Sequence, residues 1–160
     1  GQVFSGADDR RPTTDDPNVI ALPTAGYGKE SFLKAGFDPG TTDEMTVTTT
    51  PEMGITHLGP SVPSMYSTPS MVQLIESTCV RLITRYVDQG EQSVGYRVDV
   101  KHLAPTTIGE TVTARVTLRE VNGRRYLFDV EVTNEDGVQI GEGTHERALI
   151  DISRFAAAHA

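Results

Sequence analysis

The sequence is short of several features that mark common classes of protein. It has one cysteine and no tryptophan, and its 14 basic residues are outnumbered by 22 acidic ones, which gives a net charge of −8. One cysteine cannot form an internal disulfide, as expected of a protein in a reducing compartment. The chain also lacks the clustered Lys and Arg of a nucleic-acid-binding surface, and it lacks the run of about 20 apolar residues that crosses a bilayer. We therefore expect a cytoplasmic protein that binds neither nucleic acid nor membrane.

Proline is almost absent from the second half of the chain, because eight of the nine prolines lie at or before position 69. Residues 1–43 are rich in Pro, Gly, Asp and Thr and show no sustained periodicity, so we expect an N-terminal arm without a core of its own. Residues 29–35 could form a short helix in this arm, and Phe37 could anchor it. Residues 44–160 are long enough to form one domain with a real core.

The stretch 68–87 carries apolar residues at intervals of three and four, which predicts one amphipathic helix of about five turns. Thr68 is the expected N-cap, Pro69 suits a first helical position, and Gly90 is a suitable left-handed stop. Glu76 falls at the edge of the apolar face. It is therefore either a flanking residue in water or a charge directed into a pocket.

Strands are expected on both sides of this helix. Residues 44–50 are β-branched and alternating, and the connection 51–67 that follows is long enough to be a lid, a binding loop or a plain surface excursion. Four further stretches alternate apolar with polar residues. Their apolar positions are Val94, Tyr96, Val98 and Val100, then Val112, Ala114, Val116 and Leu118, then Tyr126, Phe128, Val130 and Val132, and finally Val138, Ile140, Ala148, Ile150 and Ile152. Turns are expected at 122–123 and 134–137.

The alternation in the first of these four strands places His102 on the apolar face, at the end of the strand. A helix with one apolar face and a sheet with one apolar face bury both surfaces when the sheet curls round the helix. The expected fold is therefore α+β, with an antiparallel five-stranded sheet curled round one long helix.

Three passages resemble a known family. They are residues 71–76 with 79–81, residues 98–102, and residues 141–148, whose sequence Gly-Glu-Gly-Thr-His-Glu-Arg-Ala is the most distinctive. On these passages the chain, from Thr68 onward, resembles the fluoroacetyl-CoA thioesterase family of hotdog-fold enzymes. The resemblance implies a hotdog fold and hydrolysis of an acyl-CoA or acyl-carrier thioester, with no cofactor beyond the coenzyme A of the substrate. It also implies a homodimer with sites at the subunit interface.

The family uses a threonine, a glutamate and a histidine, which the resemblance places at Thr68, Glu76 and His102, with Gly95 beside the acyl thioester. Chemistry supports these residue types. A carboxylate at the edge of an apolar helix face is partly desolvated, so Glu76 is expected to act as a base or a nucleophile. His102 could orient a hydroxyl, polarise the carbonyl or carry a proton. Whether Thr68 or Glu76 attacks the thioester is left open.

Further residues are expected to contact the substrate. The amides of Met71 and Val72 at the start of the helix, or the amide of Gly95, could hold the oxyanion. Tyr66 lies in the connection that corresponds to the family's lid. Arg147, in the distinctive C-terminal motif, could pair with a carboxylate or with a phosphate of the coenzyme A moiety.

The lid departs from the family pattern. The fluoroacetyl-specific enzyme carries phenylalanines before its threonine, whereas residues 57–67 are shorter and offer only Leu58, Val62, Met65 and Tyr66. We therefore expect an acyl group other than fluoroacetyl.

Two alternative functions stay open. A non-hydrolytic hotdog acyl-binding module would have Glu76 facing water or neutralised by an arginine such as Arg147. A hydratase-like protein would need an Asp and a His together at the helix start, and none lie near Thr68. His145 and Glu146 resemble metal ligands, but without a second pair at ligand spacing we expect no metal site.

Overall fold

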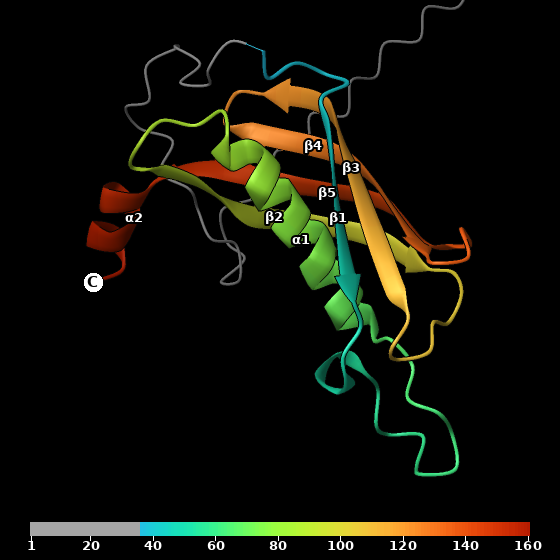
Figure 1. Ribbon diagram of the computed structural model, residues 1–160. Helices are drawn as coiled ribbons and strands as arrows, with labels where there is room; N and C mark the ends of the chain where they lie inside the picture. Colours follow the sequence, from blue (N-terminus) through green and yellow to red (C-terminus); the bar gives the residue numbers. More distant parts are fainter. Residues whose placement is uncertain (1–35) are drawn as a thin grey trace, which may run out of the picture. The chain divides into compact units, whose positions relative to one another are not determined.

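The structure, a computed structural model, describes residues 36–160. One long helix lies across one face of a five-stranded antiparallel sheet of order β1-β3-β4-β5-β2, so that β1 and β2 are the edges (Figure 1). The elements are β1 (Thr42–Thr48), the short 3-10 helix η1 (Pro51–Met53), α1 (Thr68–Thr84), β2 (Glu91–His102), β3 (Thr111–Asn122), β4 (Arg125–Asn134), β5 (Gln139–Asp151) and α2 (Ile152–Ala158). The predicted α+β arrangement is confirmed. The short helix expected at 29–35 lies outside the described residues.

The apolar faces predicted for the helix and for the central strands meet in the core. Ile75, Cys79 and Ile83 of α1 are each at most 1% exposed. The buried residues of β3 and β4 are those that the alternation predicted, namely Val112, Ala114, Val116, Leu118, Tyr126, Phe128, Val130 and Val132. Fully burying a Val, Leu or Phe side chain of this set stabilises the fold by roughly 1.5–3 kcal/mol. Phe37 is also buried, with its ring centroid 4.7 Å from that of Tyr86.

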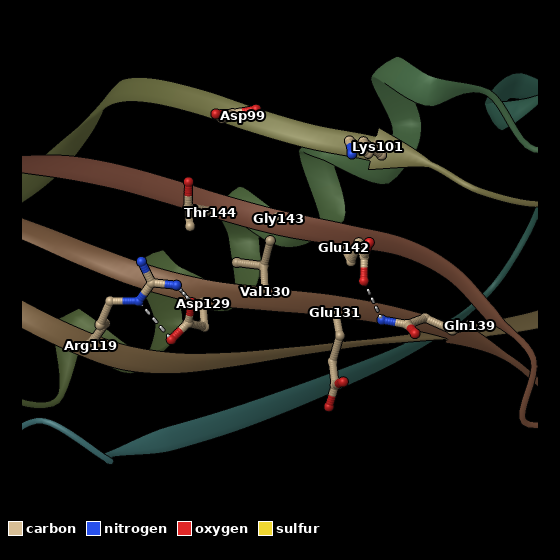
Figure 2. A pocket seen from close by; sticks show the side chains of 10 residues that line it. All are labelled: Asp99, Lys101, Arg119, Asp129, Val130, Glu131, Gln139, Glu142, Gly143 and Thr144. Atoms are coloured by element: carbon tan, nitrogen blue, oxygen red, sulfur yellow. Dashed lines mark hydrogen bonds and ion pairs between the residues drawn. The ribbon is translucent and has the colours of Figure 1, made fainter.

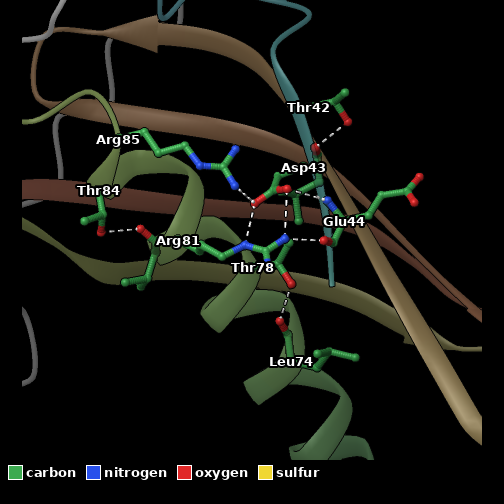
Figure 3. A network of polar contacts seen from close by, with 10 residues as sticks. Thr42, Asp43, Glu44, Leu74, Thr78, Arg81, Thr84 and Arg85 are labelled. Atoms are coloured by element: carbon green, nitrogen blue, oxygen red, sulfur yellow. Dashed lines mark hydrogen bonds and ion pairs between the residues drawn. The ribbon is translucent and has the colours of Figure 1, made fainter. Parts of the chain in front are cut away.

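An ion-pair network fastens α1 to the edge strand β1 (Figure 3). The Asp43 carboxylate accepts hydrogen bonds of 2.8 and 2.9 Å from the Arg81 guanidinium and lies 3.3 Å from Arg85. The hydrogen bonds from Arg81 hold the pKa of Asp43 below its usual value. Strand β1 begins and ends two residues before the predicted strand 44–50, so Asp43 lies within the strand.

The predicted helix limits need correction. The N-cap is Ser67, not Thr68, because Ser67 has extended backbone angles and its hydroxyl accepts a hydrogen bond from the amide of Ser70. Thr68 is therefore the first residue of the helix, and its hydroxyl is free for another partner. The helix ends at Thr84, and Gly90 instead takes its positive φ of 90° in the turn before β2.

The predicted alternation of β2 is confirmed for Val98, Val100 and His102 but is wrong before them, because the strand changes face at a bulge. Its register with β5 shifts between Gly95 and Arg97, and one extra residue reverses which side chains point inward. After the bulge Val98 pairs with the buried His145 on the helix side of the sheet, whereas Val94, before it, points to the opposite face. Such a bulge is common on an edge strand, which has only one neighbour to keep in register.

Smaller departures occur at the turns and at the C-terminal end. The β3–β4 hairpin closes with Asn122 opposite Arg125, so its two-residue loop lies one position later than predicted. Val138 and Ile152 were expected to be apolar positions of strands, but they are 48% and 49% exposed, and Ile152 begins the unpredicted helix α2. No helix within residues 36–160 is long and apolar enough to cross a membrane.

Candidate active site

Thr68 and His102 form a direct pair at the first turn of α1. The Thr68 hydroxyl lies 2.8 Å from Nδ1 of His102, the last residue of β2. Burial lowers the pKa of His102 below its usual value, so near neutral pH the ring is uncharged and Nδ1 can accept the threonine proton. The other ring nitrogen, Nε2, is buried and makes no hydrogen bond to the described part of the chain. The pair can therefore act as a hydroxyl with its own base.

Glu76, Gly95 and Arg147 form a second group, where the middle of α1 passes the first half of β2. Glu76 Oε2 lies 3.8 Å from Nη1 of Arg147. A Cβ atom at Gly95 would lie 3.1 Å from Glu76 Oε1, so the glycine keeps open the space between strand and carboxylate. The Glu76 side chain is 40% exposed, so in the single chain it is only partly withdrawn from water.

Arg147 is the buried member of this second group. Its Nε donates to the Ser93 hydroxyl at 2.8 Å, its Nη2 donates to the Ser93 carbonyl at 3.0 Å, and its Nη1 lies 3.1 Å from Nε2 of His145. Of the two partners expected for Arg147, the structure supplies the carboxylate, that of Glu76. Ser93 and His145 were not identified as site residues from the sequence, although His145 lies in the distinctive C-terminal motif.

The two groups are separate within one chain. Thr68 and Glu76 are eight residues apart on α1, which is about 12 Å along the helix axis. Gly95 and His102 are seven residues apart on β2, which is about 23 Å along an extended strand. The single chain therefore brings Thr68 to His102 and Glu76 to Gly95 and Arg147, but it does not bring Glu76 to the Thr68–His102 pair.

The expected contacts at the start of α1 change with the position of the cap. The amide of Met71 donates to the carbonyl of Ser67 at 3.0 Å, so the prediction that it is free to hold an oxyanion is wrong. Val72 lies one residue further inside the helix, where the amide takes part in the helical ladder. Tyr66 is 2% exposed and packs in the core, so it supports the site from within, and its contact with substrate stays a prediction. Of the predicted oxyanion donors, Gly95 remains.

The connection 51–67 is held at its base and exposed at its tip. Its base is fixed by hydrogen bonds of 2.8 Å from the Ser67 amide to the Met53 carbonyl and from the Tyr66 amide to the Thr106 carbonyl. At its tip Leu58 and Val62 are 50% and 40% exposed. This arrangement fits a binding loop with apolar side chains available at its end.

A charged depression lies on the face of the sheet away from α1 (Figure 2). Asp99, Lys101, Arg119, Asp129 and Glu142 are among its lining residues, and it includes none of the predicted site residues. Within residues 36–160 no group of three or more His, Cys, Asp or Glu side chains gathers as metal ligands do. The candidate site is therefore the pair of groups between α1 and β2.

Comparisons with known proteins agree with one another. The model of the fluoroacetyl-CoA-specific thioesterase family matches residues 42–153. The fluoroacetyl-CoA thioesterase of Streptantibioticus cattleyicolor is 41% identical in an alignment of 114 residues that covers 67% of this chain and 81% of that protein. A solved fluoroacetyl-CoA thioesterase structure is 35% identical with a TM-score of 0.71, covering 78% of this chain and 96% of that one. A thioesterase superfamily member from Thermus thermophilus is 28% identical with a TM-score of 0.72, covering 79% and 93% of the two chains.

Proposed function

Because this chain belongs to the fluoroacetyl-CoA-specific thioesterase family and is a hotdog-fold thioester hydrolase, we propose that Thr68, Glu76 and His102 carry out its hydrolysis of acyl-CoA. The observation that carries the proposal is the 2.8 Å contact between the Thr68 hydroxyl and His102 Nδ1. In this reaction the bond between the acyl carbon and sulfur breaks, water supplies the new oxygen, and the thiolate of coenzyme A takes up a proton. No cofactor is needed beyond the coenzyme A of the substrate.

The proposed roles follow from the surroundings of each group. The neutral imidazole of His102 accepts the proton of Thr68 and can return it to the departing thiolate. Glu76 supplies the carboxylate that attacks the carbonyl or activates water, and the open space at Gly95 admits the thioester next to it. Trapping the acyl-enzyme by rapid acid quench and locating the acyl group on Thr68 or Glu76 by mass spectrometry distinguishes the two nucleophiles.

A homodimer with shared sites joins the two groups that one chain keeps apart. Strand β2 is an edge of 12 residues with the exposed apolar side chain of Val98, 43% accessible, near its middle. If β2 pairs antiparallel with β2 of a second copy about a twofold axis near Val98, Gly95 of one copy lies opposite His102 of the other. Each site would then combine Glu76 from one subunit with the Thr68–His102 pair from its partner.

Mixing two inactive variants tests this shared site. Glu76→Gln and His102→Ala dimers should each be inactive, whereas a hybrid dimer contains one site with both residues intact. After denaturation and refolding of an equal mixture, about a quarter of the native activity is expected, since half of the dimers are hybrids with one of two sites working. No recovery in a mixture shown to contain hybrids would place the whole site within one subunit.

The catalytic proposal is tested by steady-state hydrolysis of acyl-CoA thioesters from acetyl to aryl and medium-chain, followed by thiol release. Glu76→Gln should lower kcat by orders of magnitude, whereas Glu131→Gln, an exposed glutamate on the opposite face of the sheet, should leave it unchanged. Equal activity of Glu76→Gln and the native chain would exclude Glu76 from catalysis. Because residues 57–67 offer Leu58, Val62, Met65 and Tyr66 and none of the phenylalanines of the family's lid, we propose that the preferred acyl group is not fluoroacetyl.

The contact between Glu76 and Arg147 is also what a non-hydrolytic acyl-binding module would show. Membership of a thioesterase family speaks against that alternative. So does the separation of 3.8 Å between Oε2 and Nη1, which is longer than a hydrogen bond and leaves the carboxylate available. The free and buried Cys79 fits a cytoplasmic enzyme, and we propose that location.

A further inference from the structure

Three acceptors determine the orientation of the Arg147 guanidinium. The Ser93 hydroxyl, the Ser93 carbonyl and His145 Nε2 each face a different nitrogen of the group, at 2.8 to 3.1 Å. A guanidinium is planar and its donors diverge in fixed directions, so three partners leave it no freedom to rotate. The residue is 4% exposed. Arg147 is therefore a buried cation held in one orientation.

His145 can accept from Arg147 only in one tautomer, and the backbone selects that tautomer. Its Nδ1 lies 2.8 Å from the carbonyl of Arg97, and a carbonyl only accepts, so Nδ1 carries the proton and Nε2 presents its lone pair to Arg147. Burial lowers the pKa of His145, and the charge of Arg147 lowers it further against the opposing effects of the Arg97 carbonyl and Glu76. The ring is 0% exposed and remains neutral at physiological pH.

Within residues 36–160, the carboxylate paired with this fixed cation is that of Glu76, a member of the proposed catalytic set. Nη1, the nitrogen that bonds His145, lies 3.8 Å from Oε2 of Glu76. Gly95 of strand β2 lies beside both groups and has no side chain. A Cβ there would lie 3.7 Å from Nη1 and 3.1 Å from Glu76 Oε1. Burying an arginine for packing alone is unfavourable compared with an apolar side chain of similar volume. A buried arginine with three dedicated acceptors and one half-exposed carboxylate partner is better explained by a role at that carboxylate.

We propose that Ser93 and His145 are positioning residues for thioester hydrolysis, which hold Arg147 so that its charge keeps the Glu76 carboxylate directed at the thioester. This proposal rests on the proposed function, because it acts through Glu76. Neither residue contacts the reacting atoms. Both lie on the helix side of the sheet, on β2 and β5, where the bulge of β2 brings the Arg97 carbonyl to His145.

Two amide substitutions at His145 separate its two hydrogen bonds. The amide of His145→Asn can replace Nδ1 and still donate to the Arg97 carbonyl, but nothing replaces Nε2. The longer side chain of His145→Gln can place an oxygen near Nε2 and still accept from Arg147. We expect kcat for acyl-CoA hydrolysis to fall about tenfold or more in His145→Asn with KM changed less than threefold, and to recover at least in part in His145→Gln.

A double substitution shows whether the effect passes through Glu76. In the Glu76→Gln background, where the slow residual rate is followed over hours, His145→Asn should cause no further loss. An equal loss in both backgrounds, or equal activity of His145→Asn and His145→Gln, overturns the positioning role. If His145→Asn does not fold, as judged by circular dichroism, Ser93→Ala removes one acceptor only and is put through the same cycle with the same expectations.

The two proposals fail in different ways. If Glu76→Gln alone is as active as the native chain, the proposed catalytic function fails whatever His145 does. If Glu76→Gln is inactive but the His145 and Ser93 variants keep native kcat, only the positioning role fails.

Discussion

Replacing Gly95 with alanine should lower activity without harming the fold. The new Cβ would lie 3.1 Å from Glu76 Oε1 and 3.7 Å from Arg147 Nη1, whereas relaxed contacts of this kind are about 3.5 Å or longer. The carboxylate must therefore move by roughly 0.5 Å to restore ordinary contact. Glu76 is 40% exposed and can make this movement, and alanine also restricts the unfolded chain, so the free energy of unfolding should stay within about 1 kcal/mol of native.

Catalysis is more sensitive to the same displacement than stability is. A misplacement of 1 Å can cost about a hundredfold in rate, so half that movement should cost roughly tenfold in kcat. The assay combines thiol release from a saturating acyl-CoA with urea unfolding followed by circular dichroism. If Gly95→Ala keeps native kcat, the position of the Glu76 carboxylate does not limit the reaction.

Gly141→Ala is the contrasting substitution. A Cβ there would lie 2.6 Å from the Met71 sulfur and 3.5 Å from Val132 Cβ, inside the closely packed core. Overpacking of this kind costs typically about 1–3 kcal/mol. We therefore expect Gly141→Ala to lower the urea midpoint clearly and Gly95→Ala to leave it nearly unchanged. The opposite order would show that the space at Gly95 is structural.

Three further predictions concern groups whose surroundings are known. Thr68→Ser keeps the hydroxyl that contacts His102 and should retain most of kcat, whereas Thr68→Val should lose at least about a hundredfold, and equal rates would exclude the hydroxyl from the reaction. Burial lowers the pKa of both His102 and His145 in the folded protein. In the unfolded chain the imidazole pKa is about 6.5, so just below that pH the unfolded chain binds more protons than the native protein. The free energy of unfolding, from urea curves, should therefore fall as the pH drops from 6.5 toward 5, and a flat profile would contradict this. Burial raises the pKa of the Cys79 thiol to about 12, so a chromogenic disulfide reagent should react only as the chain unfolds, and rapid labelling of the native protein would refute that burial.

The helix and the central strands could be predicted from the sequence because their signals are local. Ile75, Cys79 and Ile83 lie on one face through the helical period alone, and the alternation of β3 and β4 needs no partner to be recognised. The cap shows where local signals become ambiguous. Ser67 and Thr68 are both good capping residues, and the hydrogen bond from the Ser67 amide to the Met53 carbonyl fixes the entry of the chain so that Ser67 takes the position.

The bulge in β2 could not be predicted, because it is decided by pairing with a distant strand. The spacing of Val94, Tyr96, Val98 and Val100 predicts one continuous face, but register with β5 inserts one residue between Gly95 and Arg97. This single shift turns Ser93 and Gly95 toward the helix. It thereby creates the space beside Glu76 and the acceptors for Arg147.

For this protein the sequence alone pointed to the residues that we propose to carry chemistry, and the tertiary structure decided which of them meet. Thr68, Glu76 and His102 were identified by residue type, periodicity and a family resemblance, all of which are properties of short stretches. Their division into a Thr68–His102 pair and a separate Glu76–Arg147 group depends on contacts across 34 and 71 positions of the chain. Such contacts arise only when strand register, helix placement and a bulge have all been settled, and no local pattern encodes them.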